Sequence, residues 1–516
     1  MRRLVIGGPL TLIGVASLVA VVVLAMGSPA RPALEADGDG SITIDATRSL
    51  GPLATAFGTQ IIYPDVLPHV PDGAARLSGY APYVRVMLGT DGAYLPDHPP
   101  TLPAGWTKGA WDFRTLDELV TTAYRSGARP MLDIGYMPDW LWDCPGERPI
   151  DPSYSAFGEY AARLVSYYNR GSFVAEDGRT IVNPAGTTHR VDVWEIWNEP
   201  DLWTLACVGP TGKGPGLPSL TPATYLSIWN AVTPRMRAID PTIKLAGPTT
   251  ARGAEGNAQA YLDLLMRQAT PKPDIITMHA YGSHDERDLD RCVFDGYASG
   301  KGCFADGMAA MTKTVREFQA LAGGRPIWIT EANSLASYAI DAKARNWGPL
   351  GTAWKASAFA RMAAMNVGAI FEYSFIHPAG NQFSAIDRET GAPLLSYWTH
   401  REITRSFSVG DNILASSGVP SGIDVLAVKT ADGTVNVLVV NRRVADPTDM
   451  AGQGAAASVT LRLSGVGAGG ELTLRMLDDE TSLAEGPLSV LQPHATSATV
   501  RFDGYGAAIL TYTAAR

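Results

Sequence analysis

Short apolar runs alternate with amphipathic segments through the middle of the chain. We interpret the apolar runs as strands and the amphipathic segments as helices. The expected strands are 56–62, 83–88, 130–136, 191–197, 243–247, 274–279, 327–330 and 369–375. The expected helices are 116–126, 154–168, 222–239, 258–268, 308–322 and 353–365, with a further one at 394–406. This strand–helix repetition predicts an α/β fold, a (β/α)8 TIM barrel at residues 50–408.

After the barrel the pattern changes to short alternating runs separated by turns rich in Gly and Asp. The runs at 425–429, 435–440, 457–463, 472–477 and 507–512 have the period of half-buried strands. They predict a C-terminal β-sandwich domain at 409–516. The alternating run at 41–48 precedes the barrel and is a candidate to pair with this domain.

The N-terminal segment 1–36 stands apart from the fold. Arg2 and Arg3 are followed by 23 residues, Leu4 to Met26, without a charge. This length can span a bilayer, and the Arg pair predicts that it begins in the cytoplasm. We favour an uncleaved membrane anchor over a cleaved signal peptide, because the apolar region is longer than signal peptides use. Both interpretations predict an extracytoplasmic protein.

Four cysteines suit an exported protein, in which an even number is expected to form disulfides. Cys292 and Cys303 are close together in one Gly-rich loop, so we expect them to pair. That leaves Cys144 to pair with Cys207. The two follow successive predicted strands, so this disulfide would tie adjacent active-site loops together. Four free thiols are the alternative.

Composition narrows the class of protein further. Hydrophobic residues make up 46% of the chain and charged residues 18%, which indicates a folded globular protein. The net charge is −9 and no basic run is present, so nucleic acid is not an expected partner.

Two of the apolar runs end in a carboxylate. The run at 193–200 reads VWEIWNEP and delivers Glu199, and the run at 326–333 reads PIWITEAN and delivers Glu331. In a β/α barrel the C-terminal ends of the strands carry the chemistry. Glycoside cleavage needs two carboxyl groups that flank the scissile bond. We therefore expect the oxygens of Glu199 and Glu331 to face each other at about 5 Å.

Other polar groups are expected around this pair. An amide at Asn198 could bond a sugar 2-hydroxyl, and Arg85 could hold a carboxylate charge. His279 and Tyr281 come from the strand beside Glu331, where an imidazole or a phenol can keep a carboxylate ionised. A histidine that merely satisfies the core is the alternative for His279. Tyr136 ends another strand and is a candidate substrate contact.

Aromatic rings and two further carboxylates complete the candidates. Trp140 and Trp203 lie near strand ends, and like Tyr281 they could stack on sugar faces. Simple loop packing is the alternative. We expect Glu195 and Glu372 to be buried members of ion pairs, because both lie inside strands.

Trp197-Asn198-Glu199-Pro200 resembles the acid/base signature of clan A of the glycoside hydrolases. Within that clan, residues 50–410 are most similar to family 39, through segments 129–138, 194–202, 279–281 and 329–331. The resemblance implies that Glu199 is the general acid/base and Glu331 the nucleophile of a retaining mechanism. Ala332 after the nucleophile and the strand 371–375, which lacks a Trp, depart from many relatives and leave the sugar open.

The resemblance implies a retaining glycoside hydrolase that cleaves β-D or α-L bonds, and the N-terminal segment predicts that its substrate is an extracellular or cell-envelope glycan. We expect an oligo- or polysaccharide substrate, membrane contact through the N-terminal segment, and neither metal nor cofactor. Two alternatives remain: a non-catalytic pseudo-enzyme that binds polysaccharide, and a transglycosylase on the same scaffold.

Overall fold

The computed structural model describes residues 40–62, 66–88, 104–105, 107–202, 219–251, 257–296, 303, 307–337, 339, 341–377 and 380–515. The predicted segment 1–36 lies outside these residues, as do Trp203 and Cys207. Among the described residues, no helix combines the length and the apolar character needed to cross a bilayer.

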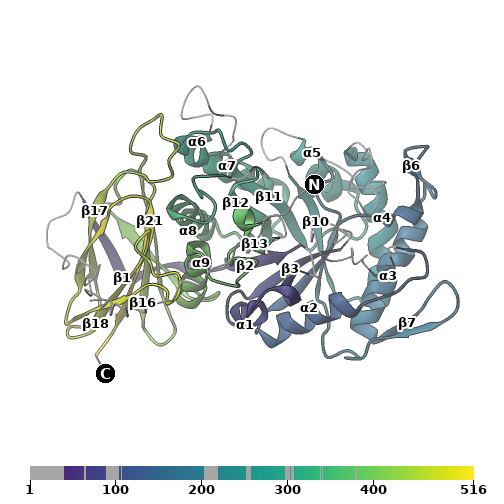
Figure 1. Cartoon of the computed structure of the whole chain (residues 1–516), viewed down its shortest axis with the longest axis horizontal. Coiled ribbons are helices and arrows are strands. Elements are labelled where there is room, and N and C mark those ends of the chain that lie inside the picture. Colours follow the sequence, from purple (N-terminus) through teal and green to yellow (C-terminus); the bar gives the residue numbers. More distant parts are fainter. Residues whose placement is uncertain are drawn as a thin grey trace, which may run out of the picture.

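A closed barrel of parallel strands forms the centre of the molecule (Figure 1), with the strand order β10-β11-β12-β13-β2-β3-β4-β9. The strands are β2 (Ala56–Ile61), β3 (Tyr83–Leu88), β4 (Arg129–Ile134), β9 (Val193–Ile196), β10 (Lys244–Thr250), β11 (Ile275–Ser283), β12 (Ile327–Leu335) and β13 (Ala369–Ile376). All eight predicted strands are confirmed. β11 and β12 run further than predicted because their ladder continues through His279–Glu331 and Tyr281–Asn333, whose polar side chains interrupt the apolar pattern.

Helices surround the barrel. Their bounds are α1 (Gly73–Leu77), α2 (Arg114–Arg125), α3 (Ser155–Arg170), α4 (Pro222–Ile239), α5 (Ala258–Gln268), α6 (Asp290–Asp295), α7 (Gly307–Leu321), α8 (Pro349–Ala364) and α9 (Leu395–Ser406). α4 begins where the sequence predicts, because Thr221 caps it by accepting from the Thr224 amide at 3.1 Å and Pro222 suits the first turn. α8 begins four residues before its predicted start. It is buried on nearly all sides, since it packs against the barrel and the C-terminal sheet.

The barrel interior is built in layers. The layer nearest the N-terminal ends of the strands, called the lowest layer below, is an apolar cluster separate from the main core. It includes Tyr83, Met131, Val193, Trp328 and Phe371. Because side chains alternate along a strand, the residues two positions further on also point inward. This next layer is polar and contains Arg85, Asp133, Glu195 and Thr330. Polar side chains are therefore stacked towards the C-terminal mouth of the barrel.

The remaining long strands form a nine-stranded sheet in the order β19-β18-β21-β16-β15-β14-β1-β17-β20. They are β1 (Ser41–Pro52), β14 (Asn412–Ser417), β15 (Ile423–Lys429), β16 (Val435–Asn441), β17 (Ala457–Ser464), β18 (Glu471–Leu477), β19 (Ser489–Pro493), β20 (Ser497–Phe502) and β21 (Gly506–Thr513). The sheet encloses its own apolar core, as the predicted sandwich requires. Figure 1 shows the purple strand β1 among the yellow C-terminal strands. β1 pairs antiparallel with β14 and parallel with β17.

Two small hairpins and a disulfide lie in the loops. The hairpins join β5 (Trp142–Asp143) to β6 (Arg148–Pro149) and β7 (Ser172–Val174) to β8 (Thr180–Val182). The predicted Cys292–Cys303 disulfide is confirmed. Cys144 is also disulfide-bonded, but its predicted partner Cys207 lies outside the described residues.

A buried ion pair joins the barrel to α8 and α9. The Lys355 ammonium donates to Glu372 at 2.7 Å, the Tyr80 hydroxyl donates to the other carboxylate oxygen, and the His400 ring lies 3.1 Å from it. This confirms the prediction for Glu372. Burial alone would raise the pKa of Glu372, but Lys355 and His400 outweigh it and lower the pKa to about 2.

This pair should make stability depend on pH. The pKa of Glu372 falls from 4.5 to about 2 on folding, so its contribution is complete above pH 4.5 and is lost as the pH falls towards 2. Glu372→Gln should therefore lower the free energy of unfolding at pH 7 by about 3–5 kcal/mol, the usual cost of breaking a buried pair. The difference in free energy of unfolding between Glu372→Gln and the natural protein should shrink as the pH falls. Urea denaturation midpoints across this range measure both effects.

Glu118→Gln is a matched control, because Glu118 is an exposed carboxylate on α2. It should change stability by no more than about 0.5 kcal/mol. A Glu372→Gln deficit that stays constant down to pH 2 would contradict the assignment of the stabilisation to the charged carboxylate.

Candidate active site

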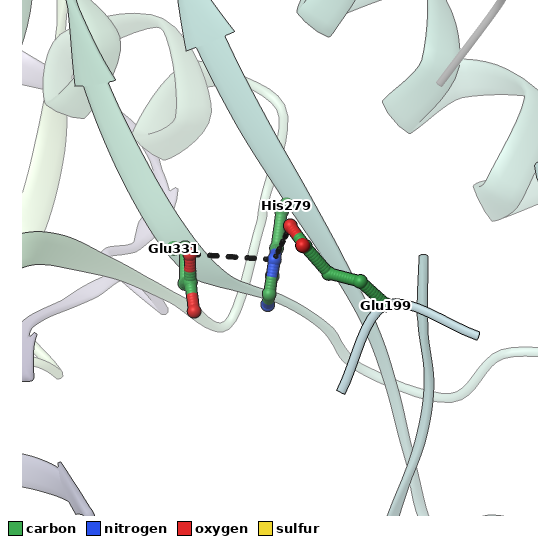
Figure 2. Close-up of side chains that lie close together, drawn as sticks. All are labelled: Glu199, His279 and Glu331. Atoms are coloured by element: carbon green, nitrogen blue, oxygen red, sulfur yellow. Dashed lines mark hydrogen bonds and ion pairs between the residues drawn. The ribbon is translucent and has the colours of Figure 1, made fainter. Parts of the chain in front are cut away.

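Glu199 and Glu331 meet at the C-terminal mouth of the barrel, with His279 between them (Figure 2). Glu331 lies in β12, and Glu199 lies just beyond the end of β9. One carboxylate oxygen from each Glu and one nitrogen of His279 all lie within 4.8 Å of one another. The expectation that the two carboxylates face each other is therefore confirmed.

Three donors hold the Glu331 carboxylate. The Arg85 guanidinium donates to Oε1 at 2.9 Å and the Gln60 amide donates to the same oxygen at 3.2 Å. The Tyr281 hydroxyl donates to Oε2 at 2.7 Å. Hydrogen bonds and a cation both favour the charged form of a carboxylate. The predicted contacts of Arg85 and Tyr281 with Glu331 are confirmed.

The backbone around Glu199 is strained. Trp197 and Glu199 have φ angles of 72° and 49°, in the left-handed region that residues other than glycine rarely occupy. Such residues cost of order 1–3 kcal/mol each and persist only where neighbours fix them. Here the backbone N–H of Asn198 donates to the Gly135 carbonyl at 2.9 Å, and the backbone N–H of Glu199 donates to the Thr249 carbonyl at 3.1 Å. The strands on both sides thus fix the turn that points Glu199 at the cavity.

His279 is closer to Glu199 than to Glu331. Its Nδ1 lies 2.8 Å from Glu199 Oε1 and 3.5 Å from Glu331 Oε2. Burial lowers the pKa of the His279 imidazole; the charge of Glu331 opposes this shift and the guanidinium of Arg85 supports it. A neutral ring can accept the proton of a protonated Glu199 or donate to its ionised form, according to its tautomer. His279 is therefore suited to a partner that gains and loses a proton.

Arg85 connects the site to the polar layer below. Its Nε donates to Glu195 at 2.6 Å, and its Nη2 donates to Asp133 at 2.8 Å and to the Asn198 side-chain oxygen at 2.9 Å. The predicted ion pair of Glu195 is thereby confirmed. Burial would lower the pKa of Arg85, but the surrounding carboxylates, with Glu195 first, raise it above its usual value. The guanidinium remains charged beneath Glu331.

The other predicted substrate contacts are partly engaged within the protein. The Asn198 side chain donates to the Tyr136 hydroxyl at 3.3 Å, which leaves one hydrogen of its amide for a sugar. Burial raises the pKa of Tyr136 well above its usual value, so the phenol stays protonated. Trp140 donates to the Gly105 carbonyl at 3.0 Å. Contacts of Asn198, Tyr136 and Trp140 with sugar stay predictions, and Trp203 lies outside the described residues.

Gln60 is a site residue that the sequence interpretation missed. Its carbonyl oxygen accepts from Arg85 at 2.8 Å while its amide reaches Glu331, so it fixes the angle between guanidinium and carboxylate. The available signal in the sequence was a glutamine inside the predicted strand 56–62, and the structure shows that it is completely buried. Asp133 is also buried, and burial raises its pKa well above the usual value although Arg85 opposes the shift.

The same cluster has the donor types of a metal site. Glu199, His279 and Glu331 each offer one ligand atom. However, the Arg85 guanidinium lies 2.9 Å from Glu331 and places a positive charge beside one of the three candidate ligands. Repulsion between like charges disfavours an ion there. The arrangement instead suits a pair of carboxyl groups that act directly on a substrate.

A β/α barrel with two facing carboxylates at its C-terminal mouth is the arrangement that glycosidases of the barrel class use. A family model for glycosyl hydrolases family 39 matches residues 105–403, more than half of the chain. The chain therefore belongs to glycosyl hydrolases family 39. A comparison with curated protein sequences gives no match.

Solved structures share the fold at low identity. The GH39 enzyme from Xanthomonas axonopodis pv. citri has a TM-score of 0.62 at 15% identity, over 93% of this chain and 98% of that chain. A monomeric beta-xylosidase from Caulobacter crescentus CB15 has a TM-score of 0.61 at 15% identity, over 92% and 100%. A glucosidase from Croceicoccus marinus has a TM-score of 0.60 at 16% identity, over 93% and 100%.

Proposed function

We propose that this glycoside hydrolase is a retaining enzyme that cleaves β-D or α-L glycosidic bonds by double displacement. The observation that carries the proposal is the separation of the carboxylates, with oxygens of Glu199 and Glu331 within 4.8 Å. Retaining enzymes hold their carboxyl groups about 5–5.5 Å apart, whereas inverting enzymes leave about 6.5–9.5 Å for a water molecule.

The surroundings divide the roles. Glu331 accepts hydrogen bonds from Arg85, Gln60 and Tyr281, and these donors stabilise the anion that a nucleophile must be. The same donors stabilise the carboxylate when it departs as a leaving group. Glu199 faces a neutral imidazole, which suits a group that cycles between acid and carboxylate.

In the first step a Glu331 oxygen forms a bond to the anomeric carbon while the glycosidic carbon–oxygen bond breaks. Glu199 gives its proton to the departing oxygen, so the leaving group exits as a neutral alcohol. The product is a glycosyl ester on Glu331. Arg85 loses part of its electrostatic attraction to Glu331 as the ester forms, and this attraction is restored when the ester breaks.

In the second step the ionised Glu199 removes a proton from water. The water oxygen bonds to the anomeric carbon and the Glu331 carboxylate leaves. Two inversions give net retention at the anomeric carbon. His279 can follow both proton transfers through its hydrogen bond to Glu199.

We also propose that the enzyme acts outside the cytoplasm on an oligo- or polysaccharide. The uncharged segment Leu4 to Met26, 23 residues long, supports export and a membrane anchor. Cysteines that are disulfide-bonded in the described residues are compatible with an oxidising compartment. Activity in the membrane or extracellular fraction of producing cells is the expected result, and activity confined to the cytosol would contradict it.

The stereochemical outcome tests the mechanism. Because structural neighbours include a beta-xylosidase and a glucosidase, aryl β-D-xylosides and β-D-glucosides should head the substrate panel. Proton NMR during early turnover should show the sugar released first with the anomeric configuration of the substrate. A first product of opposite configuration would refute double displacement. Binding of polysaccharide without turnover of any glycoside would instead favour the non-catalytic alternative.

A further inference from the structure

A cavity of about 590 Å³ lies at the N-terminal mouth of the barrel, opposite the catalytic carboxylates. Strands β3, β4, β9, β10, β11 and β12 contribute residues from or near their N-terminal ends. The lining is Tyr83, Tyr124, Arg129, Pro130, Arg190, Asp192, Val193, Lys244, Asp274, Ile275, Pro326 and Trp328. Small-molecule sites typically occupy about 300–1,000 Å³. The cavity therefore has room for a small ligand.

The cavity is separate from the active site. Trp328 and Glu331 lie on the same strand, and three residues span about 10 Å of an extended chain. The polar layer that contains Arg85 and Glu195 fills the barrel between them, and both side chains are completely buried. A ligand at this mouth does not contact the catalytic carboxylates.

Aromatic rings line the inner side of the cavity. Tyr83 and Trp328 belong to the lowest barrel layer, and their ring centroids are 5.1 Å apart in a tilted arrangement. Phe371 supports Trp328 from inside, with ring centroids 5.8 Å apart. Rigid rings backed by a packed layer offer an apolar contact surface at low entropic cost.

The charges around the rim do not cancel. Arg190 lies 2.7 Å from Asp192, and Asp274 pairs with Arg237 and accepts from the Leu245 amide at 2.8 Å. Lys244 is exposed, and its ammonium has no hydrogen-bond or ion-pair partner among the described residues. The acidic side chains of the lining are thus already matched by cations, and the uncommitted charge is positive.

We propose that this cavity is a non-catalytic binding site for a sugar residue that carries one carboxylate, a hexuronate. The aromatic lining, in which Tyr83 is partly exposed, offers an apolar surface for the C–H side of a pyranose. Lys244 offers a cation for the carboxylate, and Asp192 and Asp274 offer acceptors for hydroxyl groups. The site would let the enzyme hold an acidic glycan at a second point, beyond the bond cleavage proposed above.

Calorimetric titration of the full-length protein tests the site with methyl β-D-glucuronide as the probe. Methyl β-D-glucoside is the neutral analogue and adenosine monophosphate the nucleotide probe. Lys244→Gln should weaken glucuronide binding about tenfold, the usual value of one charge-assisted contact. Tyr83→Leu should weaken it as well. Lys313→Gln removes an exposed lysine on α7 and should leave binding unchanged.

Turnover of an aryl glycoside should be the same in the natural protein and in Lys244→Gln, because Lys244 lies at the other end of the barrel. Equal affinity for the glucoside and the glucuronide would overturn the proposal. So would stronger binding of adenosine monophosphate, the absence of glucuronide binding, or glucuronide binding that is unaffected by Lys244→Gln. The last outcome would place the probe elsewhere, for example at the catalytic mouth.

Discussion

Glu331→Ala is expected to lower kcat/KM on aryl glycosides by about 10⁴-fold or more, the scale on which enzymes depend on a nucleophile. The alanine leaves no oxygen to form the glycosyl ester, and Arg85, Gln60 and Tyr281 then surround a void. Steady-state rates with a nitrophenyl glycoside measure the loss. A residual rate within about tenfold of the natural protein would remove Glu331 from the nucleophile role.

Added azide should partly restore the Glu331→Ala rate, because a small anion fits the space of the deleted carboxylate beside Arg85. It would attack the anomeric carbon directly in a single displacement, so the glycosyl azide should have inverted configuration. Glu199→Ala provides the matched control. There azide attacks the ester on Glu331 in the second step, so its product should have the retained configuration.

Glu199→Ala should discriminate between substrates by their leaving groups. General acid catalysis contributes about 10²–10⁴-fold, and an alkoxide leaving group needs the proton whereas a dinitrophenolate does not. We therefore expect a loss of about 10²–10⁴-fold in kcat/KM on natural glycosides and a much smaller loss on dinitrophenyl glycosides. A series of aryl glycosides with graded leaving-group pKa values measures this slope.

Equal losses across that series would refute the acid role of Glu199. His279→Ala separates this role from positioning. It removes the ring that lies 2.8 Å from Glu199 but leaves the carboxyl group in place, so the rate should fall while proton donation persists.

The barrel was predictable because its strands are buried on both faces and stand out as apolar runs between amphipathic helices. Strand ends were less predictable where function intervenes, as at Tyr281 and Asn333, whose polar side chains continue the ladder of β11 and β12. In the C-terminal domain β14, β19 and β20 were not predicted. β19 is almost entirely exposed at the edge of the sheet, so it carries no alternation of apolar and polar residues.

The catalytic pair was predictable because each carboxylate ends an apolar run of the sequence. Arg85 and Tyr281 followed from the same rule, since both come from strand positions that face the mouth of the barrel. Gln60 was missed because a single amide in a strand does not specify its partner. The preference of His279 for Glu199 over Glu331 depends on how neighbouring strands are staggered, and the ladder shifts register between Met278 and His279.

The position of β1 has a consequence for biosynthesis. This strand leaves the ribosome before any part of the barrel, yet it lies between β14 and β17, which are translated after the barrel is complete. The C-terminal domain therefore cannot close around its core until the last strands have been made. Until then the apolar face of β1, with Ile42 and Ile44, stays without its native partners. Such exposed apolar strands favour aggregation, so we expect chaperones to bind the partly folded chain at this stage.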